Sequence, residues 1–287
     1  MSKEVKEFCE NCGCEYNPGL TVCNVCQHPI GFPNVRKANS ETEDLEQRYS
    51  DAMASLTALN KTDLVLDFQE EVKKSNVVIA KSVPDLVQLI SNKNKLITTF
   101  HREVASGARL AENNQYDPNR DAVESKAHPL YYQNINYACV SLTTVGVSYY
   151  GKAHLCLDSK TIKSRTSFFQ ENPFLLMNKL KLTISDDLPA GYRSNWGERD
   201  KLAVCKSESG LSKCAERSEF QSLVLREDVK NGDGSDFIEA NIYGPIHSLS
   251  ISRVTLVGKR DKQSSLLINA YKNQFEDIEL IDLQEGE

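Results

Sequence analysis

No run in this 287-residue sequence approaches the roughly 20 consecutive apolar residues that a transmembrane helix requires, which excludes a membrane channel. The first seven residues, Met-Ser-Lys-Glu-Val-Lys-Glu, lack the apolar core of a signal sequence, so we expect a cytoplasmic protein. Basic residues are not in surplus either. The 34 Lys and Arg against 40 Asp and Glu give a net charge of −6, which argues against a generally basic nucleic-acid coat. We therefore expect a soluble protein with no membrane partner.

Several catalytic signatures are missing as well. No glycine-rich dinucleotide-binding motif follows a predicted strand, no Gly-x-Ser-x-Gly elbow is present, and no cysteine–histidine pair forms a nucleophile motif. Internal repeats and low-complexity tracts are also absent. The sequence thus gives no support for a doubly wound dinucleotide-binding fold or for a serine hydrolase.

Cysteine, by contrast, is concentrated near the N-terminus: five of the nine lie within residues 9–26. Cys9 and Cys12 form one Cys-x2-Cys knuckle, and Cys23 and Cys26 form a second one ten residues later, with a Pro-Gly turn between them. Two such knuckles complete a tetrahedral four-sulfur site suited to Zn²⁺. About 30 residues cannot build a core alone, so the ion would contribute the folding energy, and four thiolates leave no open position for catalysis. The pattern predicts a structural zinc ribbon.

Two further residues near the knuckles are alternative ligands. Cys14 could replace Cys12 only through a less usual Cys-x4-Cys spacing, so we interpret it as a free thiol, and we interpret His28 as a surface turn residue. The other four cysteines have no common spacing and are expected to be small buried apolar side chains: Cys139, Cys156, Cys205 and Cys214.

The chain after the knuckles divides into a helical part and a mixed part. We predict a zinc ribbon in residues 1–37, a helical linker or subdomain in 38–94, and an α+β domain in 95–287. Residues 31–39 read as a linker or docking arm. A capping box, Ser40-Glu-Thr-Glu43, predicts the start of an amphipathic helix of about 20 residues. Further helices are expected over residues 63–74 and from about residue 82, and the acidic residues 276–287 are expected to fray.

From about residue 95 the pattern changes to short strands and loops. Because strands and helices alternate irregularly, we expect an α+β domain with a mainly antiparallel, split sheet. The predicted strands cover residues 96–100, 137–142, 153–157, 220–225, 236–243 and 251–257, and helical segments are expected at 161–165 and 196–206.

The most informative predicted strand is Asp236-Phe-Ile-Glu-Ala-Asn-Ile-Tyr243. A period of two places Ile238, Ala240 and Ile242 on one face and Glu239 on the other. A lone mid-strand carboxylate is costly to bury unless its face opens on a cleft; alternatively, this face meets solvent and Glu239 is an ordinary exposed residue. The pattern alone leaves both interpretations open.

Other candidate site residues lie near predicted strand ends. His101 and Arg102 follow the strand at 96–100 and could bind a ribose hydroxyl and a phosphate. Ser141 and Thr143 share a face near the end of another strand, and Tyr149 with Tyr150 could stack on a flat ring. Each of these residues is also compatible with an ordinary structural role.

These elements, in this order, resemble the ADP-ribosyltransferase-like superfamily over about residues 95–260. The resemblance rests on a His or Arg after an early strand, a Ser-x-Thr segment with nearby tyrosines, and Phe-Ile-Glu-Ala-Asn-Ile-Tyr-Gly late in the chain. The segments Tyr-Tyr-Gly-Lys-Ala-His-Leu-Cys-Leu and Arg-Thr-Ser-Phe-Phe also resemble parts of uncharacterised bacterial proteins near that group. The resemblance implies a split sheet that holds NAD, here as a substrate, between its halves.

The resemblance also implies residue roles. Glu239 would accept a hydrogen bond from the nicotinamide ribose and stabilise an oxocarbenium-like transition state. His101 would hold the adenosine ribose and Arg102 would bind the pyrophosphate. Ser141 and Thr143 would shape the nicotinamide side of the site, and Tyr149 or Tyr150 would stack on the nicotinamide ring. The position two residues before Glu239 is Phe237 rather than an acid, which makes arginine a doubtful acceptor.

Three functions are therefore open. The first is an NAD-consuming ADP-ribosyltransferase-like or NAD-glycohydrolase-like enzyme, a toxin or phage-defence effector by analogy. It would act on a protein or nucleic acid and be controlled by an antitoxin or regulatory partner. The second is a non-catalytic adaptor whose ribbon binds a protein or nucleic acid. The third is a metal-dependent nuclease built from the charged residues near 193–206 with Glu219 and Asp236.

Overall fold

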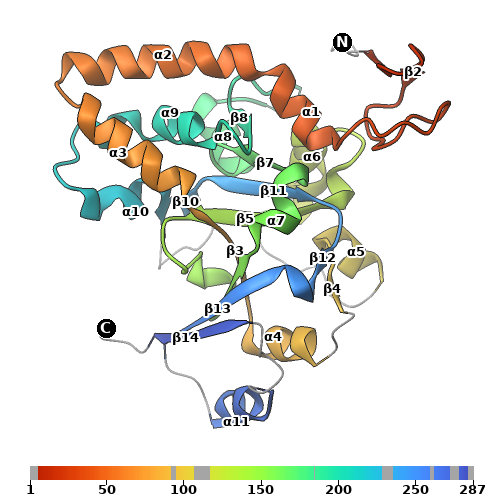
Figure 1. Ribbon diagram of the computed structural model, residues 1–287, viewed down its shortest axis with the longest axis vertical. Helices are drawn as coiled ribbons and strands as arrows, with labels where there is room; N and C mark the ends of the chain where they lie inside the picture. Colours follow the sequence, from red (N-terminus) through yellow and green to blue (C-terminus); the bar gives the residue numbers. More distant parts are fainter. Residues whose placement is uncertain are drawn as a thin grey trace.

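A large, mostly antiparallel sheet runs through the middle of the protein, with helices above, below and at its ends (Figure 1). The computed structural model describes residues 6–91, 95–106, 117–183, 185–227, 235–258, 262–271 and 278–283. The eight strands are ordered β14-β13-β6-β3-β5-β11-β7-β8, and within this sheet only β13 and β14 pair in parallel. The predicted α+β class with a mainly antiparallel sheet is confirmed.

The strands of this sheet are short and come from the whole length of the chain. In spatial order they are β14 (Glu279–Leu283), β13 (Ile251–Val257), β6 (Ala153–Leu157), β3 (Asn76–Lys81), β5 (Ile135–Ser141), β11 (Glu239–Tyr243), β7 (Thr166–Phe169) and β8 (Arg193–Asn195). Three two-stranded pairs lie outside it: β1 (Glu7–Phe8) with β2 (Glu15–Tyr16), β4 (Leu96–Ile97) with β12 (Ile246–His247), and β9 (Leu225–Arg226) with β10 (Asp236–Phe237).

The sheet opens along one side of β3. On one edge, β3 pairs with β5 from Asn76 only as far as the Val78–Cys139 pair. On its opposite edge, β3 pairs with β6 from Val78 to Lys81, which lies opposite Ala153. Beyond Val78 no residue of β3 pairs with β5, so the two strands separate. This opening positions the cavity described below.

Helices cover both faces of the sheet. The long α2 (Thr42–Ala58), α3 (Thr62–Lys73) and α9 (Arg199–Leu211) pack together over one face, where Ala240 and Ile242 of β11 join Phe168 of β7 in the main core. On the other face, Phe169 packs with Ala127 and Leu176 in a smaller cluster. The remaining helices are α4 (Val83–Ile90), α5 (Phe100–Ala105), α6 (Asp117–Ala127), α7 (Ser159–Ile162), α8 (Pro173–Leu180), α10 (Phe220–Val224) and α11 (Lys262–Tyr271).

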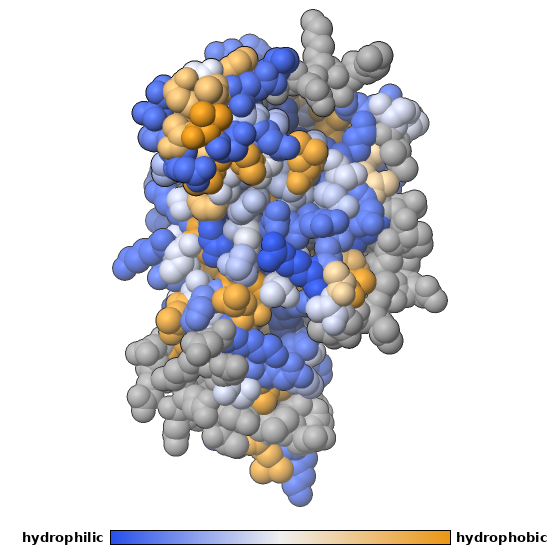
Figure 2. All heavy atoms as spheres, turned by 90° about the vertical axis from the view of Figure 1, so that its right-hand side faces the viewer, coloured by the Kyte–Doolittle hydropathy of each residue, from blue (hydrophilic) through white to orange (hydrophobic). Residues whose placement is uncertain are grey.

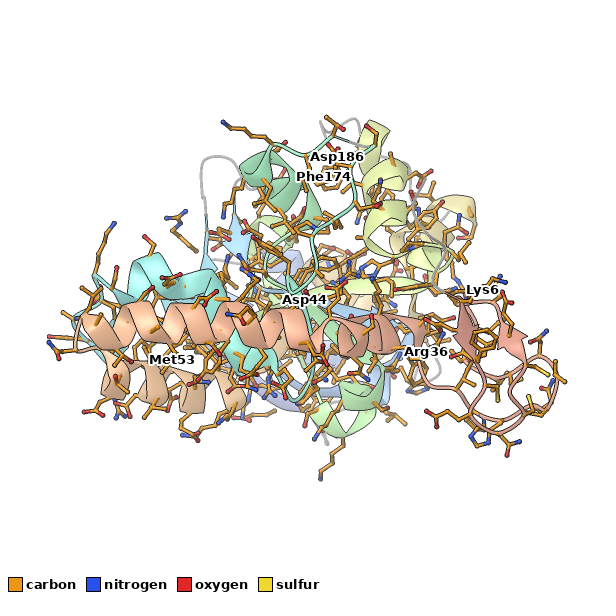
Figure 3. The ribbon with its side chains drawn as sticks, turned by 90° about the horizontal axis from the view of Figure 1, so that it is seen from above. Lys6, Arg36, Asp44, Met53, Phe174 and Asp186 are labelled. Carbon is orange, nitrogen blue, oxygen red and sulfur yellow. The ribbon has the colours of Figure 1, made fainter. Side chains whose placement is uncertain are left out.

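The N-terminal cysteine segment, residues 6–32, is anchored to the large domain through α1 (Pro33–Ser40); we call this segment the cysteine ribbon. Arg36 lies at their junction (Figure 3), where its guanidinium donates to Pro18 O and Gly31 O, both at 2.7 Å, and to Glu7 Oε2 at 2.9 Å. Two residues earlier, the buried Asn34 amide donates to three acceptors: Arg165 O, Ser167 Oγ and Asn241 O. One helix therefore connects the ribbon to the strands β7 and β11.

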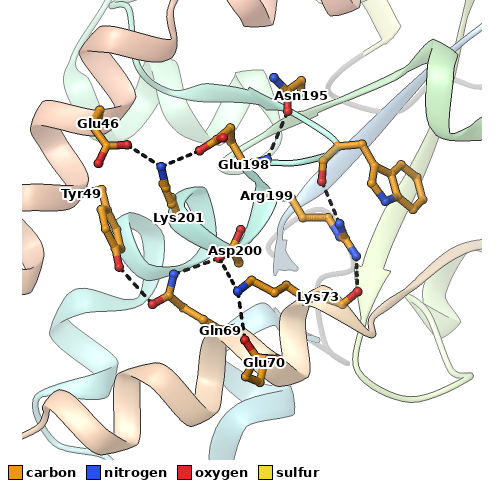
Figure 4. Close-up of polar contacts among 11 residues, drawn as sticks. Glu46, Tyr49, Gln69, Glu70, Lys73, Asn195, Glu198, Arg199, Asp200 and Lys201 are labelled. Atoms are coloured by element: carbon orange, nitrogen blue, oxygen red, sulfur yellow. Dashed lines mark hydrogen bonds and ion pairs between the residues drawn. The ribbon is translucent and has the colours of Figure 1, made fainter.

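Charged residues of α9 bind neighbouring helices rather than an open surface (Figure 4). Lys201 contacts Glu46 of α2 at 2.5 Å and Glu198 at 2.8 Å. Asp200 accepts from Gln69 of α3 at 2.9 Å, and Arg199 donates to the carbonyl of Lys73. These contacts hold α2, α3 and α9 together.

Several sequence predictions about local structure were wrong. Residues 96–100 do not form one strand: β4 ends at Ile97, and Thr99, whose hydroxyl accepts from Arg102 N, caps α5, so His101 lies on a helix. Of the strand expected at residues 220–225, Phe220–Val224 form α10, and only Leu225 belongs to a strand, β9. Ser40 does not open a capping box, because it ends α1, and α2 begins at Thr42.

Other segments differ in extent. Most of the expected linker, residues 31–39, belongs to α1, and the helix expected at 196–206 begins at Arg199. The strand β3 lies within the stretch predicted as helical, 38–94, yet occupies the centre of the sheet. Of the acidic tail, Glu279–Leu283 forms β14, while residues 276–277 and 284–287 lie outside the described residues. None of the described helices is long and apolar enough to cross a membrane.

A buried ion pair fixes α1 and α2 to β8. Arg193 Nε lies 3.0 Å from Glu41 Oε1, and both side chains are buried. We expect Glu41→Gln to lower the free energy of unfolding by about 3 kcal/mol in urea denaturation, because it leaves a buried guanidinium unpaired. Lys37→Gln removes only the half-exposed partner of the same carboxylate and is expected to cost less than about 1 kcal/mol. Equal effects of the two variants would contradict this account.

Candidate functional site

The four cysteines of the two knuckles converge. The sulfur atoms of Cys9, Cys12, Cys23 and Cys26 all lie within 4.8 Å of one another. The Cys9–Cys26 and Cys12–Cys23 sulfur pairs are 3.6 and 3.7 Å apart, close to the separation of about 3.8 Å expected for four thiolates bound 2.3 Å from a tetrahedral ion. This set is compatible with structural metal binding.

Neighbouring groups support this ligand set. Val25 N donates to Cys23 Sγ at 3.4 Å and Asn11 Nδ2 donates to Cys26 Sγ at 3.5 Å, and such bonds favour the thiolate form that binds metal. Cys14 and the exposed His28 lie outside the cluster, as the spacing predicts. Among the described residues, these four cysteines form the one group of His, Cys, Asp or Glu side chains arranged to hold a metal ion.

A cavity of about 970 Å³ occupies the opening between β3 and β5. Its wall is formed by β3 from Val78 onward, one side of α4, β5 up to Cys139 and part of α6, and by the tyrosines of a short turn, Ser148–Tyr150. A volume of this size lies in the range of small-molecule and cofactor sites.

Glu239 is a buried carboxylate on the wall of this cavity. It begins β11 directly opposite Cys139 of β5, and only 3% of the residue is exposed. Asn241 Nδ2 donates to Glu239 Oε1 at 3.0 Å and Asn172 Nδ2 donates to Oε2 at 3.2 Å. Burial raises the pKa of Glu239 to about 8, since the low-dielectric surroundings disfavour the charged form. The solvent-exposed alternative is therefore ruled out.

A second carboxylate, Glu124 of α6, lines the same cavity and is also buried. Its Oε1 accepts from Arg120 Nε at 2.5 Å, and its Oε2 lies 2.6 Å from His101 Nε2. The guanidinium of Arg120 stacks on Phe100 at 4.0 Å. The charge of Glu124 further raises the pKa of Glu239. The cavity thus places two acids near one another, a pattern typical of catalytic sites.

Tyr149 and Tyr150 present about half of their surfaces to solvent and form an edge-to-face pair with ring centroids 5.4 Å apart. Both line the cavity. The next residue, Gly151, has φ +148°, and a Cβ atom there would lie 2.1 Å from Lys81 O. A glycine is therefore required for this turn to pack against the end of β3.

The other predicted site residues lie outside the main cavity. His101 and Arg102 line a smaller cavity of about 360 Å³, which shares Phe100 and Arg120 with the main one. Ser141 donates to Val145 O at 2.7 Å and contacts Thr143 at 3.1 Å, within the loop that follows β5. The structure brings Glu239, Tyr149 and Tyr150 to one cavity. His101 does not line this cavity but contacts Glu124, which does. Ser141 and Thr143 do not line it.

Sequence reasoning missed three polar residues of the cavity. Arg120 and Glu124 are spaced i,i+4, as expected for a helical ion pair, and that spacing could have marked α6. Asn172 precedes Pro173 and caps α8 by accepting from Phe174 N, a recognisable helix start. Nothing in the sequence links either feature to Glu239.

The charged residues near 193–206 do not form an open cluster with Glu219 and Asp236. Asp236 pairs with Lys206 and Lys179, whereas Glu219 accepts from Ala215 N and Glu216 N in a separate turn. Their carboxylates belong to no candidate metal group in the described part of the chain.

No protein-family model matches the chain, and no curated protein matches it significantly.

Proposed function

We propose that the main cavity binds NAD and that the protein is an NAD-consuming, ADP-ribosyltransferase-like enzyme. The observation that carries the proposal is Glu239, a buried carboxylate on the wall of an open cavity of about 970 Å³ at the point where β3 and β5 separate. Burying a carboxylate beside a cavity costs stability even where neutral amides donate to it, because the amides do not compensate its charge. Such a cost is typical of functional sites.

Glu239 is suited to stabilise positive charge that develops on a ribose as nicotinamide leaves. Two asparagine amides hold its oxygens, so the carboxylate needs no reorientation during the reaction. Its low-dielectric position strengthens the attraction between the carboxylate and an oxocarbenium-like ring. The ionised form is the active one.

Other residues fit the remaining parts of NAD. Tyr149 or Tyr150 would stack on a flat ring. Three cationic side chains line the cavity and could bind the pyrophosphate: Lys81, Lys95 and Arg120. The resemblance assigns the pyrophosphate to Arg102 and the adenosine ribose to His101. Neither residue lines the main cavity, whereas Lys81 and Arg120 do, which favours these two for the pyrophosphate.

The cysteine ribbon would hold one structural Zn²⁺ and support the enzyme through α1. The biological role, a toxin or phage-defence effector with a macromolecular acceptor and a regulatory partner, rests on the resemblance alone.

Nicotinamide release tests the proposal. The purified full chain is incubated with NAD, and nicotinamide is quantified by chromatography. We expect release by the wild-type chain and by Glu279→Gln, which removes an exposed strand carboxylate paired with Arg253, and we expect strong loss in Glu239→Gln. No release by the wild-type chain, with and without candidate protein or nucleic-acid acceptors, would reject the enzyme.

A second candidate function is an adaptor that binds through the ribbon. Phe8, Val22 and Val25 are apolar yet exposed on this segment, and Figure 2 shows apolar side chains among hydrophilic ones near the top of the face on the ribbon side. An adaptor would keep its partner in Glu239→Gln and lose it in Val25→Ser. An enzyme shows the reverse dependence for NAD cleavage.

A further inference from the structure

His101 lies between two carboxylates. Its Nε2 is 2.6 Å from Glu124 Oε2, and its Nδ1 is 3.2 Å from Asp121 Oδ1. The Glu124 side chain is almost fully buried, whereas that of Asp121 is 76% exposed. The three residues therefore form a chain that leads from the inside of the protein to its surface.

The two ends of this chain face different cavities. Glu124 lines the main cavity together with Glu239, and Asp121 lines the smaller cavity together with His101. Arg120, whose guanidinium stacks on Phe100, lies between the cavities and holds the other oxygen of Glu124. The chain thus joins the reaction space to the outer cavity.

The contacts require one additional proton among the three groups. An imidazole carries one or two protons, and a carboxylate can only accept. The hydrogen bond to Glu124 and the 3.2 Å contact with Asp121 are both attractive only if the ring is an imidazolium or if one of the two acids is protonated. One proton can therefore occupy several sites along the chain.

We propose that Glu124 and His101 form a proton relay that removes the proton of the acceptor during group transfer and delivers it to Asp121. This inference rests on the proposed function. The bond between ribose C1 and the nicotinamide nitrogen breaks, and its electron pair leaves with nicotinamide. The acceptor oxygen or nitrogen bonds to C1 and gives its proton to Glu124. A proton moves from Glu124 to His101 Nε2, another leaves Nδ1 for Asp121, and Asp121 releases it to solvent.

The relay defines the chemistry of the acceptor. A base is needed only where the nucleophile carries a proton that it loses, as in a hydroxyl or a neutral N–H group. A phosphate or carboxylate acceptor has no such proton. We therefore infer that the acceptor is a hydroxyl or a neutral N–H group.

The surroundings of both relay residues set its pH dependence. His101 faces Asp121 and Glu124 of α6, its neighbour Arg102, and the edge of the Tyr132 ring, with centroids 4.9 Å apart. Glu124 faces a further set of titratable or charged groups: Arg120, Tyr137 and Glu239.

Kinetic measurements give the first test. We expect Glu124→Gln to lower kcat by about 10²-fold, with the KM for NAD changed by less than about twofold. His101→Gln keeps a donor toward Glu124 and is expected to lower kcat about 10-fold and to abolish the solvent deuterium isotope effect. Asp187→Asn, which removes an exposed carboxylate paired with Lys126 of α6, is the matched control and is expected to retain full activity.

Nitrogen NMR of His101 gives a second test that needs no turnover. Because the relay links Glu239 and His101 through Glu124, the His101 imidazole signals should show a step near pH 8, where Glu239 titrates. The step should vanish in Glu239→Gln and in Glu124→Gln but remain in Asp187→Asn. If the step is present but NAD is not cleaved, the coupling of Glu239 to His101 through Glu124 is supported and the proposed function is rejected. Absence of the step, or full kcat in the folded Glu124→Gln variant, would overturn the relay.

Discussion

Glu239→Gln is expected to lower NAD turnover by about 10²–10³-fold, because glutamine keeps the shape of the side chain but cannot supply a negative charge to the transition state. The KM for NAD should change little, since the charge acts mainly as nicotinamide leaves. Initial rates of nicotinamide release at pH 8 measure this effect. A rate within threefold of the wild-type rate would remove Glu239 from the mechanism.

The same variant is expected to be more stable than the wild-type chain. Glu239 has a pKa of about 8 in the folded protein against 4.5 for the free side chain. Between these values the unfolded chain has released the proton that the folded chain holds, so wild-type stability falls as pH rises from about 4.5 to 8. Glutamine has no such dependence. The stability gap should be small at pH 5 and about 3 kcal/mol at pH 7.

Turnover should rise with pH as Glu239 ionises, whereas stability falls. Below the folded pKa of about 8 the carboxylate is mostly protonated and cannot stabilise a cation. We expect kcat/KM to rise about tenfold per pH unit from pH 6 to 7.5 and to level off above about 8. The wild-type pH profile, measured beside that of Asp187→Asn, tests this. A profile that is flat from pH 6 to 9 would contradict a buried, initially protonated Glu239.

Removal of the metal is the second large effect that we expect. The ribbon has only a very small core, formed by Cys9, Tyr16 and Cys23 with two partly buried neighbours. We therefore expect its fold to depend on a bound ion, since structural Zn²⁺ contributes on the order of 10 kcal/mol to such segments. A chelator should unfold residues 6–32, which hydrogen exchange would detect, while the neighbouring strands β5, β11, β7 and β8 of the large sheet stay protected.

Matched cysteine variants sharpen this test. Cys12→Ser is expected to reduce bound zinc from one ion per chain to a small fraction, whereas Cys14→Ser should keep the full ion, because Cys14 lies outside the four-sulfur cluster. Metal content by mass spectrometry measures both. Equal loss in the two variants would mean that the ligand set is wrong.

Features governed by local spacing could be predicted from the sequence. The two Cys-x2-Cys knuckles converge as their spacing requires, and the period of two in β11 correctly separated Ile238, Ala240 and Ile242 from Glu239. A helix was also predicted over most of α3. In each case neighbouring residues determine the structure, with little influence from distant segments.

Features that depend on tertiary contacts could not be predicted. The strand β3 lies between two helices and looks like a short apolar run, which periodicity alone cannot distinguish from a buried helix. The hydroxyl of Thr99 caps a helix where the sequence predicts a strand. His101 therefore lies on that helix and lines the smaller cavity rather than the main one. The proximity of Glu124 to Glu239 joins residues 115 positions apart, and no local pattern encodes it.

The most direct test of the central claim is a crystal structure of the full chain with a non-hydrolysable NAD analogue. We predict that the nicotinamide ribose lies within hydrogen-bond distance of Glu239, in the opening between β3 and β5, with Tyr149 or Tyr150 against a ring of the ligand. Binding elsewhere, or a cavity that stays empty at saturating analogue while the ribbon alone binds a partner, would contradict it.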